Sequence, residues 1–136
     1  MDTVEGQSTD KQLPCDVITT RLLIKKGWID QLAKKALPAA FLLPLKDLDT
    51  GLSLFYDLPP EQCASRMNKV LGLASLHVGS IRSLMLDVYA DDVHHAYIVG
   101  LPCSEVENLS EEDAKRAERL AVELAKQSRL YWTKPL

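Results

Sequence analysis

The sequence lacks the motifs that usually identify a catalytic or metal-binding protein. Its 136 residues contain six glycines and three cysteines, each standing alone in the chain. There is no glycine-rich phosphate loop, no GxSxG nucleophile elbow and no HExxH zinc motif. Any indication of function therefore lies in individual polar residues and in the strands or helices expected to carry them.

Disulfide patterns and long apolar runs are also missing. Cys15, Cys63 and Cys103 are widely spaced and form no CxxC pair, which is typical of reduced thiols rather than of a disulfide framework. No apolar run approaches the roughly 18 to 20 residues of a membrane span. The first residues, Met1 to Glu5, lack the basic and apolar regions of a signal peptide. We therefore expect a cytoplasmic protein without a membrane partner.

The chain has no surplus of positive charge. Its 16 basic and 19 acidic residues give a formal net charge of -3 at pH 7. Broad nucleic-acid binding needs an excess of Lys and Arg facing phosphates, so nucleic acid is not the expected partner. Hydrophobic residues make up 46% of the chain, which is enough to build the core of an ordinary globular domain.

Hydrophobic periodicity predicts groups of strands separated by short helices. Helices are expected over 28–37, and from the prolines at 59 and 60 to a left-handed C-cap at Gly72. A hairpin is expected between 39–43 and 52–56. The predicted strands are 17–24, 39–43, 52–56, 73–78, 84–89 and 94–99. Because the connections between strands are short, the pairing is expected to be antiparallel.

The clearest predicted element is a long C-terminal helix over residues 110–129. Ser110 is expected as its N-cap, with Asp113 three residues later as in a capping box. An alanine-rich apolar stripe runs along its length. The sequence thus predicts an α+β fold with a mainly antiparallel sheet of about five or six strands and two to three helices packed on it. It predicts a single domain over 15–136 and a flexible N-terminal tail over 1–14.

Two adjacent histidines, His94 and His95, form the most conspicuous polar pair. Adjacent residues on a strand point to opposite faces, so only one of them can face a given site, and which one is left open. If His95 and Tyr97 share a face, they lie about 6.6–7 Å apart along it. Histidine can act as acid or base near neutral pH, although both residues also suit a structural role at a strand end. His95 is a candidate catalytic residue, and His94 and Tyr97 are candidate ligand-binding residues.

Ser53 and Arg21 are further polar residues on predicted strands. Ser53, or alternatively Cys63 or Cys103, is a candidate nucleophile for a nearby histidine, although no oxyanion-hole motif accompanies it. Arg21 must reach water, pair with a carboxylate or hold an anionic ligand. On one sheet face with Ser53 and His95, Arg21 would complete an anion-binding pocket.

No metal site and no cofactor are predicted. His77, His94, His95 and Cys103, with the aspartates at 91 and 92, have the chemistry to bind zinc. Their spacing matches no standard zinc pattern, and histidines on opposite faces of a strand are poorly placed to share an ion.

Two functions remain open at this level. The first is a small interaction or regulatory module that binds a protein partner or a second copy of itself as a homodimer or other homo-oligomer. Trp28, Tyr131 and Trp132 are its candidate interface residues, although they also suit closure of the core. The second is a small enzyme or ligand-binding protein for an anionic, nucleotide-like molecule, with a pocket of His, Arg, Ser and Tyr. Whether the chain is an enzyme is left open.

Overall fold

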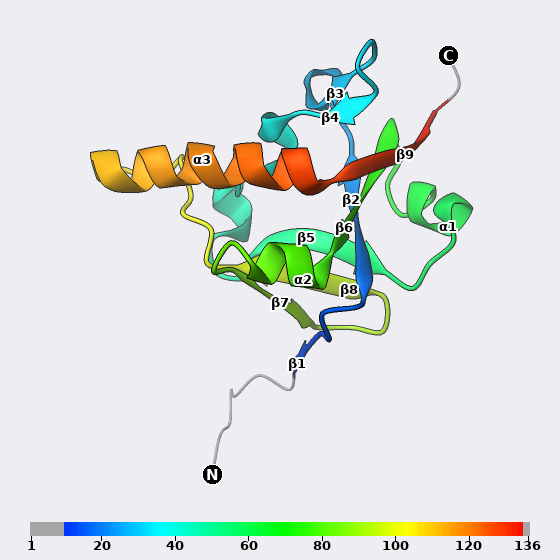
Figure 1. The fold of residues 1–136 in the computed structure, drawn as a ribbon, viewed down its shortest axis with the longest axis horizontal. Helices are drawn as coiled ribbons and strands as arrows, with labels where there is room; N and C mark the ends of the chain where they lie inside the picture. The colour runs from blue at the N-terminus through cyan, green and yellow to red at the C-terminus, as the bar shows by residue number, and fades with distance from the viewer. Residues whose placement is uncertain (1–9, 135–136) are drawn as a thin grey trace.

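A computed structural model describes residues 10–134 and has a seven-stranded sheet at its centre (Figure 1). The strand order is β1-β7-β8-β5-β2-β6-β9, and every neighbouring pair is antiparallel. The strands are β1 (Lys11–Gln12), β2 (Ile18–Leu23), β5 (Leu52–Tyr56), β6 (Gly72–His77), β7 (Asp87–Ala90), β8 (His95–Val99) and β9 (Arg129–Thr133). A separate small hairpin pairs β3 (Ile29–Asp30) with β4 (Lys35–Ala36). The predicted α+β class and antiparallel sheet are confirmed.

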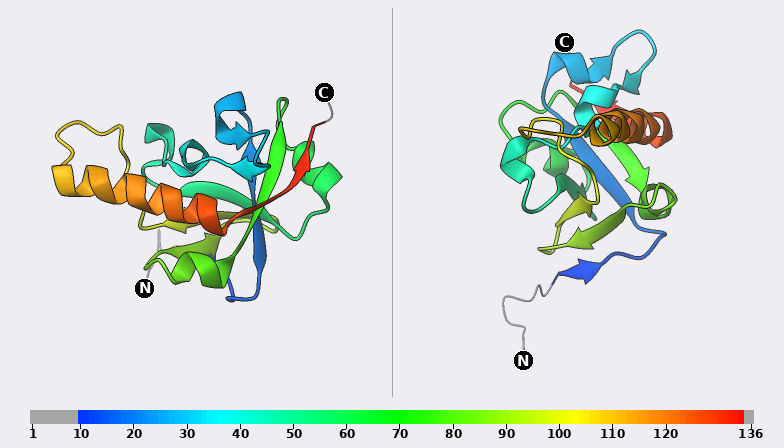
Figure 2. Two further views of the ribbon diagram at one scale, coloured as in Figure 1. Left: turned by 45° about the horizontal axis from the view of Figure 1, so that its top comes forward. Right: turned by 90° about the vertical axis from the view of Figure 1, so that its left-hand side faces the viewer.

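One long helix and several short ones surround this sheet. The α-helices are α1 (Pro60–Ala64), α2 (Val78–Arg82) and α3 (Glu111–Gln127), and the 3-10 helices are η1 (Lys26–Trp28), η2 (Pro38–Phe41) and η3 (Leu45–Asp47). The ribbon views show α3 lying along one side of the molecule (Figures 1 and 2). The N-terminus of α3 is at the left in Figure 1, and α1 lies at the right. None of the helices within residues 10–134 is both long and apolar enough to cross a membrane.

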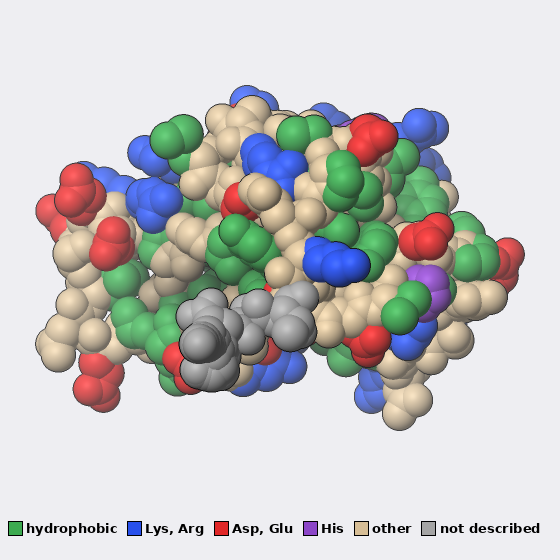
Figure 3. All heavy atoms as spheres, turned by 90° about the horizontal axis from the view of Figure 1, so that it is seen from below, with side chains coloured by type: hydrophobic (Ala, Val, Ile, Leu, Met, Phe, Trp, Pro, Cys, Tyr) green, Lys and Arg blue, Asp and Glu red, His purple; other side chains and the backbone are tan. Residues whose placement is uncertain are grey.

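The C-terminal helix forms as its capping signals predict. The Ser110 side chain accepts a hydrogen bond from the backbone N–H of Asp113 at 3.0 Å, which satisfies a donor that has no partner inside the helix. The first turn is acidic, and acidic side chains gather at this end of the molecule, at the left in Figure 3. The buried side of α3 is formed by Ala117, Leu120, Ala121, Leu124 and Ala125. The three alanines on this side allow η2 to pack closely against the helix.

Strands β5 and β8 divide their residues cleanly between two faces. Leu52, Leu54, Ala96 and Ile98 are fully buried in the main core, whose other members include Phe41 of η2 and the apolar side of α3. The alternate residues of β5 and β8, which include Ser53 and His95, are half-buried on the other face. The period of two therefore lines up the polar residues of these two strands on the side away from the main core.

The entry into β5 depends on Gly51. Its φ of 145° lies in a region that L side chains rarely adopt, and a Cβ there would collide with the carbonyl oxygen of Ile98. Glycine therefore lets the chain turn tightly beside β8, two residues before Ser53.

The helix predicted over 28–37 is wrong, because the segment forms the β3–β4 hairpin. The Asp30 side chain accepts hydrogen bonds from the backbone N–H groups of Leu32 at 3.1 Å and Ala33 at 2.9 Å. This local capping turns the chain back instead of continuing a helix, and Lys34 follows with a φ of 56°. Leu32 is 97% exposed at the tip of this hairpin.

The strand predicted over 39–43 and its hairpin with 52–56 are also wrong. Residues 38–41 form the 3-10 helix η2, which begins with Pro38 and carries the fully buried Ala40 and Phe41. A proline has no N–H to contribute to a sheet, so η2 packs beneath α3 while β5 pairs with β2 and β8.

The helix predicted up to Gly72 ends at Ala64. The Ser65 hydroxyl donates to the carbonyl oxygen of Gln62 at 2.9 Å, an alternative to helical bonding that favours a turn. Gly72 is the first residue of β6 and not a helix cap.

The two outer strands were not predicted. Of the expected tail over 1–14, residues 1–9 lie outside the described residues, while Lys11 and Gln12 pair with β7 and Leu13 is buried. At the other end, α3 stops at Gln127 and residues 129–133 pair with β6. The sheet therefore has one strand more than the upper end of the expected range.

Candidate functional site

Three polar side chains form a continuous hydrogen-bonded chain on the face of β5 and β8 that points away from the main core. Ser53 Oγ lies 2.7 Å from Nε2 of His95. The other ring nitrogen of His95, Nδ1, lies 2.6 Å from Oδ1 of Asp91. A serine, a histidine and an aspartate are thus joined through both nitrogens of one imidazole ring, the connectivity of a catalytic triad.

The backbone brings these three residues together from separate segments. The register pairs Ser53 with Tyr97 and Phe55 with His95, so the serine and the histidine lie two positions apart on neighbouring strands. Asp91 follows β7 in the turn that leads into β8, and its backbone N–H donates to the carbonyl oxygen of His95 at 3.1 Å. This turn directs the Asp91 carboxylate back onto the imidazole.

One aromatic ring packs against the imidazole, and two more extend the same face. Phe55 meets the ring of His95 edge to face, with the ring centroids 5.0 Å apart. Tyr97 stacks on Tyr89 at 6.3 Å, and its hydroxyl donates to the carboxylate of Asp10. His95 retains 31% side-chain exposure and Asp91 38%, so the Ser53–His95–Asp91 chain is reachable from solvent.

Arg21 approaches Ser53 from the other side of β2. Thr20 pairs with Phe55, so the Thr20 side chain lies on the sheet face that carries Phe55 and Ser53. Arg21 is the next residue and pairs with Ala74, so its side chain leaves the strand on the opposite face. Its guanidinium nevertheless donates from Nη1 to the carbonyl oxygen of Ser53 at 3.0 Å, and from Nε to that of Ala40 at 2.7 Å. The guanidinium therefore touches the backbone of the candidate nucleophile.

The strand geometry explains this contact. The Tyr56 N–H donates to the carbonyl oxygen of His94, so the backbone N–H and C=O groups of Tyr56 point toward β8. These groups alternate in direction along the strand, so those of Ser53, three residues earlier, point toward β2. Strands β2 and β5 pair only through Thr19 with Tyr56 and Thr20 with Phe55. Ser53 lies past the end of this pairing, so its carbonyl oxygen has no backbone donor from β2. The Arg21 guanidinium donates to it instead.

Burial changes the protonation equilibrium of this arginine. Arg21 is only 7% exposed. Burial lowers the pKa of its guanidinium to about 10, while the Asp47 carboxylate acts in the opposite direction. Arg21 is therefore still charged at neutral pH, but in a poorly solvated position.

A cavity of about 520 Å³ lies beside Ser53. Arg21, Ser53 and Phe55 contribute to its wall from the sheet, and Trp28 and Lys46 contribute from η1 and η3. Of the residues proposed from sequence, Ser53 and Arg21 thus line one cavity, and His95 is bonded directly to Ser53.

The remaining candidate residues are dispersed. Nδ1 of His94 is buried and has no hydrogen-bond partner among residues 10–134, and the residue is not part of the Ser53–His95–Asp91 chain. Trp28 lines the cavity beside Ser53, whereas Trp132 packs against the small cluster beneath α1. Tyr131 lies elsewhere on the sheet, with its hydroxyl 3.0 Å from the hydroxyl of Thr20.

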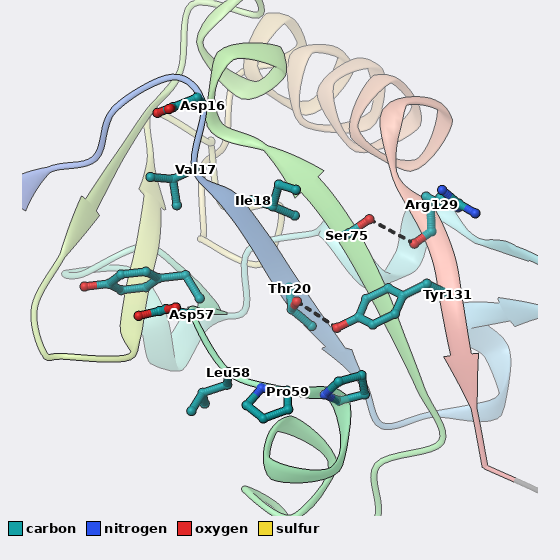
Figure 4. Close-up of a pocket in the computed structure, with 12 residues that line it drawn as sticks. Asp16, Val17, Ile18, Thr20, Asp57, Leu58, Pro59, Ser75, Arg129 and Tyr131 are labelled. Carbon is teal, nitrogen blue, oxygen red and sulfur yellow. Dashed lines mark hydrogen bonds between the residues drawn. The ribbon is translucent and has the colours of Figure 1, made fainter.

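Tyr131 lines a second, larger hollow on the outer side of β2, β6 and β9 (Figure 4). This hollow has a volume of about 790 Å³. Its rim carries two hydrophobic side chains that remain accessible, Ile18 at 51% exposure and Tyr131 at 38%. Asp16 and Asp57 lie on the side of β2 away from Arg129 (Figure 4).

Sequence reasoning missed one member of the hydrogen-bonded chain, Asp91, which it considered only as a metal ligand. The signal was its position four residues before His95, between the strands predicted over 84–89 and 94–99, a spacing that a hairpin can close. Among residues 10–134, no group of three or more His, Cys, Asp or Glu side chains is placed to hold a metal ion.

Comparisons with known proteins do not extend this picture. No protein-family model, no curated protein and no solved structure matches the chain. What the chain reveals about its function therefore lies in the geometry of the site.

Proposed function

We propose that the protein is a small hydrolase in which Ser53 is the nucleophile, His95 the general base and Asp91 the residue that orients His95. The observation that carries this proposal is the pair of short contacts, 2.7 Å and 2.6 Å, that join both imidazole nitrogens to the serine and the aspartate. A nucleophile and base within hydrogen-bond reach, with the base held by a third group, is the arrangement that activates a serine.

The contacts support one direction for the proton transfer. A carboxylate at Asp91 accepts the Nδ1 proton of His95, which leaves Nε2 as the acceptor for the hydroxyl proton of Ser53. As Ser53 Oγ attacks an ester carbonyl, its proton passes to Nε2. The same proton then protonates the departing alcohol, leaving an acyl group on Ser53. Water next attacks this acyl group and gives a proton to His95, and the carboxylic acid is released with the proton returned to Oγ.

Hydrolysis of p-nitrophenyl esters of short carboxylic acids tests this proposal. We expect the purified protein to release p-nitrophenol catalytically, and Ser53→Ala to reduce kcat/KM to the background rate. Ser75→Ala is the matched control, because Ser75 lies on β6 of the same sheet and pairs with Thr20, as Phe55 of β5 does. Equal rates for wild type and Ser53→Ala, or equal losses in both serine variants, would contradict the assignment.

A second candidate function, self-association, is favoured by the hollow in Figure 4. We propose that a second copy of the chain occupies it. Ile18 and Tyr131 offer exposed hydrophobic surface, while Asp16 and Asp57 lie across the hollow from Arg129. In a two-fold symmetric pair, each copy can place its arginine against the acidic side of the other, so this patch is complementary to itself.

Sedimentation velocity over about 1 to 100 µM protein tests the self-association. We expect wild type to shift from monomer to dimer with concentration and Ile18→Asp to remain monomeric, because the carboxylate would be buried in the contact. Val122→Asp, on an exposed position of α3 outside the hollow, should dimerise like wild type. A wild-type monomer at every concentration, or unaltered dimerisation of Ile18→Asp, would end this candidate.

A further inference from the structure

The cavity beside Ser53 has the size of a small-molecule site. Its volume of about 520 Å³ falls within the roughly 300–1,000 Å³ typical of ligand pockets. The wall is built from β2, β5 and the short segments η1 and η3, so residues far apart in the chain face one space. What this wall offers to a ligand follows from three groups of side chains.

The first is a buried positive charge that forms no ion pair with the part of the chain that the structure describes. Arg21 is only 7% exposed, and the hydrogen-bond partners of its guanidinium are two neutral backbone carbonyls. No carboxylate of residues 10–134 lies within 4.0 Å of it, since the ion pairs in this part of the chain involve other residues. Burying an unpaired charge costs free energy, and a bound anion would recover part of that cost.

The second is a local surplus of positive charge. The cavity and the shallow hollow that adjoins it through Ile24, Lys25 and Met67 are lined by five cations and two carboxylates. The cations are Arg21, Lys25, Lys46, Arg66 and Lys69, and the carboxylates are Asp47 and Glu105. The whole chain has a net charge of -3, whereas this region has more positive than negative side chains. The region would therefore attract anions.

The third is an aromatic and apolar surface next to those charges. Trp28 and Phe55 both line the cavity, together with Leu42 and Met67. The Arg21 guanidinium lies 5.1 Å and the Lys25 ammonium 5.8 Å from the ring centroid of Trp28. The cavity therefore places positive charge immediately beside surfaces on which a planar ring can pack.

We propose that this cavity binds a small molecule that combines a phosphate or carboxylate group with a planar aromatic ring, a nucleotide-like ligand. Arg21 and Lys46 hold the anionic group, and the ring packs among Trp28, Phe55 and Met67. One part of this inference rests on the proposed function, namely that the bound molecule is the substrate and that its reacting ester faces Ser53. The binding site itself stands on the cavity and its charges.

Adenosine 5'-monophosphate is the test ligand and uncharged adenosine its matched control. Binding is measured by isothermal titration calorimetry on the Ser53→Ala protein, so that the result does not depend on turnover. We expect the monophosphate to bind at least about tenfold more tightly than adenosine, the effect of a charged hydrogen bond. Arg21→Gln and Lys46→Ala should each remove most of that difference, whereas Lys115→Ala on the exposed side of α3 should leave it unchanged.

The outcomes separate this inference from the proposed function. Equal affinity for the monophosphate and adenosine, or an unchanged preference in Lys46→Ala, overturns the anion site even if Arg21→Gln fails to fold. Monophosphate binding without any Ser53-dependent ester hydrolysis supports the site and contradicts the hydrolase. Ser53-dependent hydrolysis with no preference for anionic ligands supports the hydrolase and contradicts the site.

Discussion

Replacing His95 by alanine is expected to lower kcat/KM for ester hydrolysis by about 10³-fold or more. In the proposed mechanism, His95 accepts the Ser53 proton across the 2.7 Å contact between Nε2 and Oγ, and no other imidazole bonds to Ser53 among the described residues. Without it the hydroxyl has to react as a weak neutral nucleophile. Steady-state hydrolysis of p-nitrophenyl esters, with thermal unfolding measured in parallel, gives the result.

The pattern across several variants distinguishes a catalytic unit from independent contributions. Because Ser53 and His95 act in one step, the double variant Ser53→Ala/His95→Ala should be no slower than either single variant. Asp91→Asn should also lower kcat, because the amide no longer fixes the tautomer that leaves Nε2 free to accept. His77→Ala, an exposed histidine at the end of β6, is the control and should retain full activity. Additive losses in the double variant would contradict the unit.

The largest expected effect on stability comes from Phe41→Ala. Phe41 is fully buried in η2, within the core cluster that also contains the apolar side of α3. Truncating a buried phenylalanine typically lowers the free energy of unfolding by about 3–5 kcal/mol, because transfer and cavity costs add. Urea unfolding monitored by circular dichroism measures the change.

Leu32→Ala is the matched control for that experiment. Leu32 is 97% exposed at the tip of the β3–β4 hairpin, so its truncation should change the free energy of unfolding by less than about 0.5 kcal/mol. If the segment 28–37 were the amphipathic helix that its periodicity predicts, Leu32 would be buried and the loss would be several times larger. A large effect of Leu32→Ala would therefore contradict the hairpin.

The sheet face of the site was predictable because strands have a strict period of two. Once β8 was recognised, His95 and Tyr97 had to share one face, and the confirmed strand β5 placed Ser53 opposite Tyr97. The pairing partner of β5 was not predictable from the segment 39–43, because apolar content alone does not distinguish a strand from the buried 3-10 helix that forms there.

Two features of the site depended on information that is not local in the sequence. Asp91 joins His95 only because the turn between β7 and β8 closes with both residues at its base. Arg21 contacts Ser53 because β2 and β5 cease to pair after two residues, which opens room for a guanidinium beside the strand. A sequence pattern can indicate that such residues are candidates for a site. Which of them come into contact depends on the strand register and on the order of strands in the sheet.

Covalent labelling of the intact protein by a fluorophosphonate tests the central claim most directly. An activated serine displaces fluoride from the phosphorus and forms a stable Oγ–phosphorus bond, while the hydroxyl proton passes to the histidine. Peptide mass spectrometry should locate one adduct at Ser53, with none at Ser75 and none in the His95→Ala protein. An unlabelled Ser53 under conditions that label a known serine hydrolase, or equal labelling with and without His95, would contradict its role as the activated nucleophile.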